Sequence, residues 1–305
     1  MKGVIPKLQS RYLIIINKTS NQGMTKKIWP NIKHELNHYH VKYIATASRY
    51  SQNIYLITEE YIKKAKANDI LMVIGGDGTL NRVLNSTQKL TQQNSDLPIL
   101  PIAYLPTGAK NYFARIHHIS LNYAKALRQI IFKGKIHQIK IGYFNETIKK
   151  NQQYFTHNNE IGFSLASIKA MSRSKFHWHF LKIWWNLIAS LYDAESFPLS
   201  IYRPNKTTIV KRVLQINIDT YPGLQTKPPY LSLTIFRKYN FFIMLYLVLK
   251  LYFQKHLKSK FIYHLKATTF HLGIPTLEYC RIDNENMGSC FYNLYYHFTK
   301  YPFIL

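Results

Sequence analysis

The sequence predicts an α/β protein with two domains. In the N-terminal domain, helices cover a largely parallel sheet in three layers, and the C-terminal domain is mainly an antiparallel β-sandwich. Two observations predict this. Up to about residue 134, short apolar runs alternate with longer amphipathic segments, a rhythm typical of β-α-β-α folds. After residue 135 the segments become β-rich, with aromatic-rich helices between them, as in an antiparallel sheet.

Each strand of the first domain is predicted from a short, mainly apolar run, and a longer amphipathic segment follows it. In chain order the predicted strands and helices are 12–16 with 24–39, 40–45 with 51–66, 69–74 with 80–91, and 99–105 with 111–132.

The second domain is predicted from short alternating segments. Its strands are 135–144, 199–201, 210–218 and 230–236, with loops at Pro222 and Pro228–Pro229. The tryptophan-rich segment 176–192 is either an interfacial membrane helix or a helix with a buried face, and a buried face is favoured. The helix predicted at 240–256 is expected in the core. The predicted domains are 1–134, 135–290, and a C-terminal strand and tail, 291–305, that packs back toward the first domain.

The composition describes a strongly basic globular protein. The formal net charge is +27, which attracts polyanions such as nucleic acid, anionic bilayers and nucleotide phosphates, or reflects a coding bias toward Lys, Asn, Ile and Tyr. Cys280 and Cys290 lack the spacing of a metal or disulfide motif. Neither a secretory signal nor an apolar run of about 20 residues is found, so a cytoplasmic protein is predicted.

One motif carries chemistry. Residues 75–79 read Gly-Gly-Asp-Gly-Thr and lie between a predicted strand and a predicted helix. Glycines let the backbone approach a phosphate, and the helix that follows offers free N–H groups. A glycine turn alone is more often a tight turn without function. The carboxylate of Asp77 among the glycines favours a functional site, because an acid beside a phosphate implies a metal or a proton transfer.

The motif resembles the nucleotide-binding signature of the diacylglycerol kinase catalytic family, which is related to sphingosine kinases, bacterial lipid kinases and NAD kinases. Further segments are similar to family motifs in the same order. Segment 14–23 resembles the first strand and its Asn-Pro-x-Ser-Gly-x-Gly loop, and Thr46 resembles a Thr that follows the family's second strand. Segment 105–115 resembles Pro-x-Gly-Thr-x-Asn-Asp-Phe-Ala-Arg. Segment 160–164 resembles Gly-Ile-Gly-Phe-Asp, and segment 282–285 resembles the C-terminal Asp-Gly-Glu.

The resemblance implies a Rossmann-like nucleotide-binding domain and an ATP-dependent lipid kinase that acts with Mg²⁺ on a membrane lipid hydroxyl, with the nucleotide held between the two domains. It implies that Asp283 and Glu285 are catalytic and accept the hydroxyl proton, and that Asp77 is catalytic and organises Mg²⁺ or its water. The residues implied to bind the nucleotide are Asn17, Thr19, Ser20, Thr46, Gly75, Gly76, Asp77, Gly78, Thr79, Asn81, Gly108 and Asn111. An anionic membrane surface is the expected partner, at the inner face of the membrane, with no specific nucleic acid.

The sequence departs from the family pattern mainly at acidic positions. Ala109 replaces a Thr, Tyr112 and Ser164 replace Asp residues, and Arg82 stands where the motif continues into Asn-Glu. Pro228–Pro229 stands in place of an Asp-Gly. Fewer carboxylates bind Mg²⁺ more weakly, so no tightly held Mg²⁺ is expected without nucleotide. Lys110 and Arg82 are hypothesised to replace part of the metal's charge.

Four alternatives stay open. A kinase-like protein that binds nucleotide or anionic lipid without turnover is the main one, because of the lost acids. A nucleic-acid binder is suggested by charge alone, without a recognised motif. An NAD kinase is disfavoured by the Asp-x-Glu at 283–285. Metal sites at His117–His118 or at 177–179 lack partner ligands at suitable spacing.

Overall fold

The structure is a computed structural model that describes residues 10–48, 50, 53–148, 150–163, 194–204, 206–252, 261–283 and 285–305. The tryptophan-rich segment 176–192 and Ser164 lie outside the described residues. The chain forms two compact units. Unit 1 contains Met1–Gly142, Gln153–His157 and Thr299–Leu305, and unit 2 contains Tyr143–Gln152 and Asn158–Phe298.

Unit 1 is built on a parallel sheet, as the apolar runs predict. Its strands are β1 (Tyr12–Asn17), β2 (Tyr43–Ser48), β3 (Ile70–Gly75) and β4 (Ile102–Pro106). Strand β1 pairs with both β2 and β3, and β3 pairs with β4, all in parallel. The last residues of β13 (Glu285–Ile304) pair with β4 at Phe303 and Ile304. The strand order is therefore β2-β1-β3-β4-β13.

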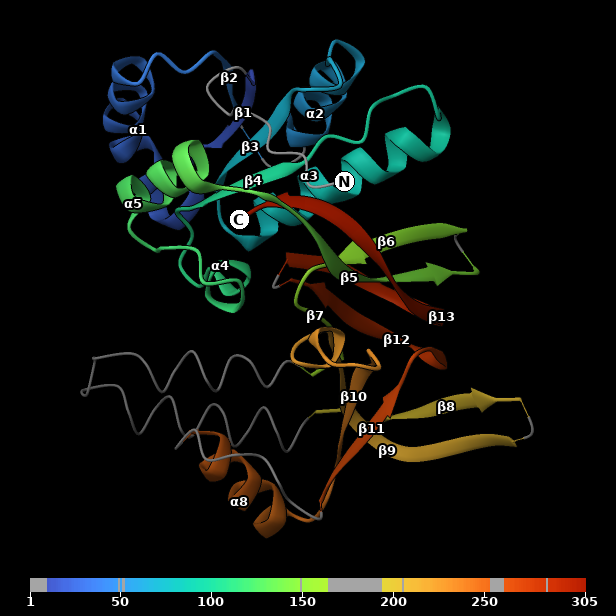
Figure 1. Ribbon diagram of the computed structural model, residues 1–305. Helices are drawn as coiled ribbons and strands as arrows, with labels where there is room; N and C mark the ends of the chain where they lie inside the picture. The colour runs from blue at the N-terminus through green and yellow to red at the C-terminus, as the bar shows by residue number, and fades with distance from the viewer. Residues whose placement is uncertain are drawn as a thin grey trace. The chain divides into compact units, whose positions relative to one another are not determined.

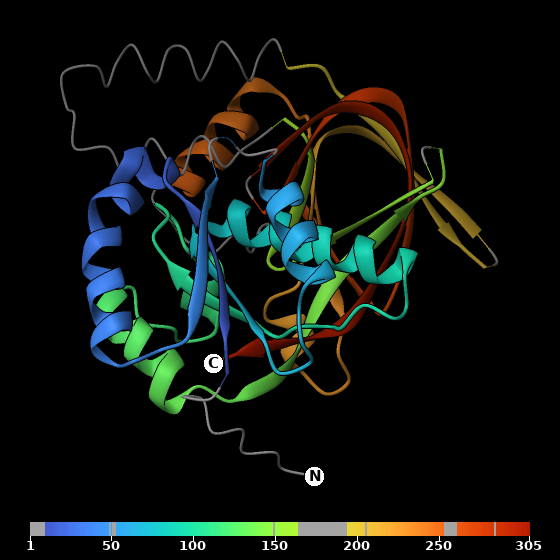
Figure 2. The ribbon, with the colours of Figure 1, turned by 90° about the horizontal axis from the view of Figure 1, so that it is seen from above.

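Helices cover both faces of this sheet. Helices α1 (Ser20–His38) and α5 (Tyr123–Arg128) lie on one face, and α2 (Asn53–Lys63) and α3 (Asp77–Gln93) lie on the other (Figures 1 and 2). A parallel sheet covered on both faces buries its central strands β1, β3 and β4 almost completely, which explains why these three read as apolar runs, whereas the edge strand β2 is only partly buried. The predicted three-layer arrangement is confirmed for unit 1.

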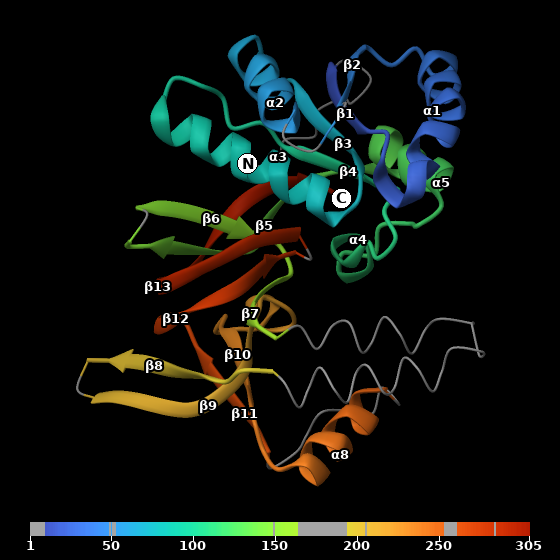
Figure 3. The same ribbon diagram turned by 180° about the vertical axis from the view of Figure 1, so that it is seen from behind.

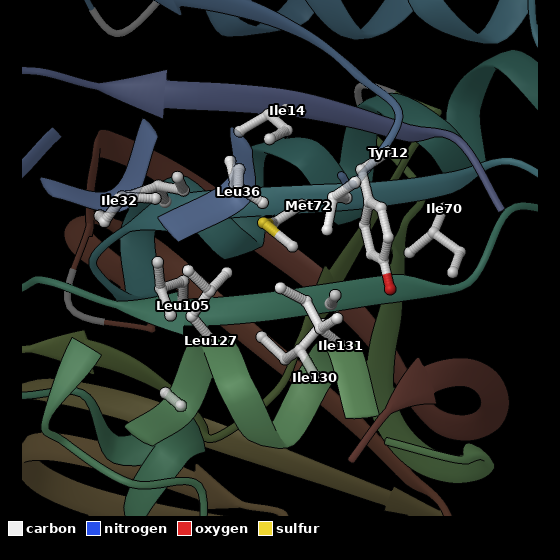
Figure 4. Packing of buried hydrophobic residues seen from close by; sticks show 14 of the residues in the cluster. Tyr12, Ile14, Ile32, Leu36, Ile70, Met72, Leu105, Leu127, Ile130 and Ile131 are labelled. Carbon is white, nitrogen blue, oxygen red and sulfur yellow. The ribbon is translucent and has the colours of Figure 1, made fainter. Parts of the chain in front are cut away.

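The core under α1 and α5 is tightly filled (Figure 4). Alternate residues of the strands, such as Ile14 and Met72, point toward this face and meet Ile32 of α1 and Leu127 of α5, all fully buried. Each such side chain stabilises the fold by about 1.5–3 kcal/mol relative to its exposed state. Tyr12 lies in the same cluster, and its hydroxyl has no hydrogen-bond partner in the described part of the chain.

The predicted single helix at 111–132 is wrong in its continuity. It is divided into α4 (Tyr112–Ile116), α5, and a π-helical turn at Gln129–Lys133. Two residues explain the break. His118 has a φ of 56°, which ends α4, and the side chain of Asn122 accepts hydrogen bonds from the amides of Ala124 and Lys125, which begins α5.

Unit 2 is mainly an antiparallel sheet, as predicted, and views from two sides show its strands (Figures 1 and 3). Strand β9 pairs with β7, β8 and β10, β10 pairs with β11, and β12 pairs with β7, β8 and β13, all antiparallel. The strands are β5 (Ile136–Glu146), β6 (Asn151–Phe155), β7 (Asn158–Gly162), β8 (Phe197–Arg203), β9 (Lys206–Asp219), β10 (Leu231–Arg237), β11 (Ile262–Ala267) and β12 (Phe270–Ile282); β5 and β6 have residues in both units. The sandwich arrangement and the domain boundaries at residues 134 and 290 stay predictions.

Helix α8 (Phe241–Tyr252) contributes to a core, as expected for the segment from residue 240. Its Met244 and Leu247 are buried against Leu214, Phe236 and Ile262. Within the described residues, no helix has both the length and the apolar character needed to cross a membrane.

Candidate functional site

The sheet of unit 1 has a switch point between β1 and β3. The chain leaves β1 toward α1 on one face and leaves β3 toward α3 on the other face (Figure 2). In open α/β sheets, ligands bind outside the carboxyl ends of the strands at such a point, because the diverging loops leave a crevice there. The predicted motifs 17–23 and 75–79 are the two loops that leave these strands.

The first loop reverses direction through left-handed backbone. Asn21, Gln22 and Gly23 have φ values of 50°, 55° and 83°, so the regular part of α1 begins near residue 24, as the sequence predicts. Asn17 holds the base of the loop. Its side-chain oxygen accepts hydrogen bonds from the amide and hydroxyl of Thr19, at 3.1 and 2.8 Å.

The two loops are joined by a hydrogen bond. The Asn17 Nδ2 donates to Thr79 Oγ1 over 2.8 Å. Thr79 is buried, and a Cβ on Gly75 would lie 2.6 Å from its Oγ1, so only glycine fits at the end of β3. The switch point is therefore held by residues that the motif predicts.

A second glycine turn packs against the first. Gly108 follows β4, and a Cβ placed on it would overlap the Cα of Gly76, so the two backbones approach too closely for a side chain. The loop after β4 is fixed by Asn111, which has a left-handed φ of 50°. The Asn111 Oδ1 accepts from the Gly108 amide at 3.0 Å, and its Nδ2 donates to the Gly108 carbonyl at 2.7 Å. The Tyr104 hydroxyl also donates to Asn111 Oδ1, at 3.1 Å.

Asp77 joins the same two loops through its carboxylate. The side chain is buried, and its two oxygens accept hydrogen bonds from the amides of Tyr112 at 2.9 Å and Phe113 at 3.2 Å. These are two of the unpaired amides at the start of α4, which a carboxylate caps well. The structure therefore gives Asp77 an anchoring contact that the sequence did not predict.

The other residues of unit 1 that are predicted to bind the nucleotide do not all lie at the glycine turns. Ser20 lies beside the glycine turn, since its Oγ would be 3.5 Å from a Cβ on Gly76. Gly78 lies in the first turn of α3 and is buried. The Thr46 hydroxyl accepts a hydrogen bond from Tyr61, at 2.7 Å, on the strand next to β1. Asn81 points elsewhere, because its amide donates to the carbonyl of Tyr154 at 2.8 Å and ties α3 to β6.

A basic and an aromatic side chain, Lys110 and Tyr112, lie together on the loop after β4. The ring of Tyr112 stacks on His157, with centroids 4.5 Å apart, and the Lys110 ammonium lies 5.9 Å from the Tyr112 ring centroid. The ammonium interacts favourably with the face of the ring. Lys110 lies on the loop after β4, and the hypothesis that Lys110 and Arg82 replace part of the metal's charge stays a prediction.

His117 follows α4 and is half-buried. Its ring packs on Phe113, with centroids 4.4 Å apart. Burial disfavours the charged form and, together with the charge of His118, lowers the pKa of His117 to about 4. The histidine is therefore neutral near neutral pH.

In unit 2 the two predicted catalytic acids belong to one turn. Asp283 is 1% exposed, has a left-handed φ of 48°, and joins β12 to β13. Its Oδ1 accepts from the Asn158 amide at 3.1 Å, and its own amide donates to the Asn158 carbonyl at 2.9 Å. Glu285 pairs with Ile282 across the turn and is half-buried. A buried carboxylate beside a more open one fits two different roles.

The sequence analysis missed a polar network next to Asp283. On β7 and β9, Asn158, Glu160, Asn217 and Asp219 lie on one face of the sheet and are joined by side-chain hydrogen bonds. The alternation of apolar and polar residues at 216–219 was the available signal, because the period of two places Asn217 and Asp219 on one face.

The acids of the described residues do not form a protein-only Mg²⁺ site. No group of three His, Cys, Asp or Glu side chains in the described part of the chain is arranged to hold a metal ion. Asp77 uses its oxygens to hold two amides. The residues that the structure describes therefore do not fit a resident Mg²⁺.

A doubly wound α/β unit with two glycine turns at its switch point is typical of proteins that bind nucleotide phosphates. Residues 11–144 match the family model described as the diacylglycerol kinase catalytic domain. The predicted resemblance to the diacylglycerol kinase catalytic family is thereby confirmed for residues 11–144.

Individual proteins are similar to this chain in sequence or in structure. A diacylglycerol kinase from Staphylococcus saprophyticus is 27% identical over 169 residues, which are 55% of this chain and half (50%) of that relative's length. The crystal structure of a diacylglycerol kinase from Bacillus anthracis str. Sterne covers 98% of this chain and 97% of its own, with a TM-score of 0.65 and 16% identity. A second structure from the same organism gives a TM-score of 0.69 at 18% identity, with the same coverage. The structural likeness shows the fold.

Proposed function

We propose that this protein is an ATP-dependent lipid kinase that transfers the γ-phosphoryl group of ATP to a hydroxyl group of a lipid. The observation that carries the proposal is the meeting of two glycine turns, at Gly76 and Gly108, at the switch point of the sheet. There the backbone presents N–H groups without a Cβ in the way, at the N-terminus of α3, which attracts anions. The family match over residues 11–144 supports the same use of this site.

In the proposed reaction, the two glycine turns bind the triphosphate and a carboxylate serves as the base. Asp283 takes the proton from the lipid hydroxyl, the hydroxyl oxygen bonds to the γ-phosphorus, and the bond to the bridging oxygen breaks so that ADP leaves. The hydrogen bond from the Asn158 amide holds one oxygen of Asp283 in place. Glu285, on the same turn and more exposed, is the second candidate for this proton.

Mg²⁺ would enter this site with the nucleotide, because the chain's own acids do not form a site for it among the described residues. The cations on the loop after β4 contribute instead. In the proposal, the Lys110 ammonium stabilises negative charge on the phosphates, with its position limited by the Tyr112 ring. The same proposal includes a membrane lipid as the substrate, an anionic membrane surface as the partner, and localisation at the inner face of the membrane.

A second candidate is a protein that binds nucleotide or anionic lipid without turnover. The observation that favours it is the carboxylate of Asp77, which serves as an anchor for Tyr112 and Phe113. If Asp77 only anchors this loop, few acidic residues remain to take part in catalysis. The presence of both Asp283 and Glu285, the acids of the C-terminal motif, argues against this candidate.

The experiment is transfer of labelled phosphate from ATP into a mixed lipid extract. We expect a labelled lipid with the native chain and with Asp96→Asn, an exposed control, and a loss of about 100-fold or more with Asp283→Asn. The side-chain amide that Asp283→Asn introduces keeps an oxygen that can accept from the Asn158 amide, so the fold is retained. Binding of ATP by the folded chain with no labelled lipid from any extract would favour the second candidate.

A further inference from the structure

Two buried threonine hydroxyls meet between α1 and the loop after β4. Thr25 is fully buried and Thr107 is 5% exposed, and their Oγ1 atoms lie 2.6 Å apart. Each hydroxyl group has one O–H donor and can also accept, so the pair contains two donors and uses only one of them for the bond between the two threonines. Neither side chain has another hydrogen bond in the described part of the chain, so one buried O–H group is left without an acceptor there.

Other buried threonines of unit 1 donate within their own helices. The hydroxyls of Thr58 in α2 and Thr87 in α3 donate to the carbonyls four residues earlier, at 2.7 and 2.9 Å. Thr25 has no such bond, because residues 21–23 have left-handed backbone and the regular part of α1 begins only near residue 24. The unused O–H group of the pair therefore destabilises the fold unless a bound molecule accepts its proton.

The pair adjoins the two glycine turns. The amide of Thr107 donates to the carbonyl of Gly75 at 2.8 Å, and the next residue, Gly108, packs against Gly76. Thr107 is also the only residue with a hydroxyl group in the loop 107–111, between β4 and α4. An O–H group that is free at Thr107 therefore lies next to the turns at which the phosphates are proposed to bind.

The chemistry of the turns selects the acceptor. The N-terminus of α3 and the glycine backbone attract anions. A phosphate oxygen accepts hydrogen bonds without donating any, and its charge strengthens them. We propose that the Thr107 hydroxyl donates to a phosphate oxygen of the nucleotide, and that Thr25, by donating to Thr107, directs the Thr107 proton toward that oxygen. Thr107 is then a nucleotide-binding residue, and Thr25 is a positioning residue.

The inference rests on the proposed function, because that function places the nucleotide phosphates at the glycine turns. Its test measures the binding of ATP, tripolyphosphate and adenosine to the full chain by calorimetry. Adenosine lacks phosphates, so its affinity reports a general distortion of the site, whereas tripolyphosphate reports the phosphate contacts alone.

Three variants change the pair in different ways. Thr107→Val removes the hydroxyl at similar volume, so the affinities for ATP and tripolyphosphate should fall at least about ten-fold, which corresponds to about 1.4 kcal/mol, while adenosine binds as before. Thr107→Ser keeps the hydroxyl and should retain the affinity for ATP within about two-fold. Thr25→Val leaves the Thr107 hydroxyl without the donor that directs it, so the affinity for ATP should fall about three-fold.

The matched control is Thr58→Val, which removes a buried hydroxyl that donates within its own helix and should leave all three affinities unchanged. Thermal unfolding without ligand shows which variants are folded, and Thr25→Val tests the inference if Thr107→Val does not fold. If Thr107→Val binds ATP as tightly as the native chain, or loses affinity for adenosine by the same factor, the inference is overturned, because the pair is then only structural or is completed by water.

The outcomes also separate the inference from the proposed function. Binding of ATP and tripolyphosphate that depends on the Thr107 hydroxyl, without phosphate transfer to any lipid, supports the inference and contradicts the kinase. Phosphate transfer to a lipid with an unchanged KM for ATP in Thr107→Val supports the kinase and contradicts the inference. A native chain that binds neither ATP nor tripolyphosphate contradicts both.

Discussion

Replacement of Asp77 by Asn tests whether its carboxylate holds the loop after β4. The two hydrogen bonds to the amides of Tyr112 and Phe113 involve a charged and buried acceptor, so each contributes about 1.5–3 kcal/mol. Asn keeps one oxygen, which retains a neutral bond of about 1 kcal/mol, while its NH₂ group faces the second amide. We therefore expect a loss of about 2–5 kcal/mol in the free energy of unfolding of unit 1.

The assay is thermal unfolding with and without ATP. For a domain of this size, each kcal/mol corresponds to about 2–4 °C in Tm, so a fall of roughly 4 °C at the least is expected. The exposed Asp96→Asn is the matched control and should shift the Tm by less than about 1 °C. The affinity for ATP should also fall, because the loop after β4 is held less firmly. If Asp77→Asn unfolds at the native temperature, the carboxylate does not hold the loop and the anchoring role is refuted.

Three further predictions concern unit 1. Gly108→Ala places a methyl group against the backbone of Gly76, so ATP affinity should fall at least about ten-fold by calorimetry, whereas the exposed neighbour change Ala109→Gly should have little effect. His117 binds a proton more readily when unfolded, because its pKa falls from 6.5 to about 4 on folding. In denaturant titrations, the free energy of unfolding should therefore be highest above pH 6.5 and should fall by about 3 kcal/mol between pH 6.5 and pH 4. His117→Gln should remove this pH dependence, and His118→Asn should keep it. Tyr12→Phe removes a buried hydroxyl without a partner in the described residues, so unfolding should be unchanged or harder by up to about 1 kcal/mol. A loss of stability there as large as that of Tyr301→Phe, which removes a bond to the Leu100 carbonyl, would contradict this reasoning.

Much of the fold could be predicted because parallel strands leave a clear pattern. The runs at 12–16 and 69–74 lie in β1 and β3, since strands covered on both faces are apolar at every position. The break in the predicted helix 111–132 was not visible, because it depends on a left-handed residue, His118, and on the cap by Asn122. The ends of helices are set by such local contacts, which periodicity does not report.

The candidate site was predicted in part. The glycines and Asn17 meet as their order along the strands implies, because carboxyl ends of neighbouring parallel strands share one edge. The contact of Asp77 with the start of α4 joins segments 35 residues apart, and no local pattern records it. The roles of Asp283 and Glu285 stay predictions that the experiments above address.

The pairing of β4 with the far end of β13 bears on how the protein folds during synthesis. Residues 299–305 complete the sheet of unit 1, where Phe303 pairs with Ile102 and the backbone of Leu305 exchanges hydrogen bonds with Lys135. Until these residues leave the ribosome, β4 is an open edge strand that carries an apolar run. Unit 1 therefore cannot finish folding before unit 2 has been synthesised, and the nascent chain must avoid aggregation through β4 while residues 107–305 are made.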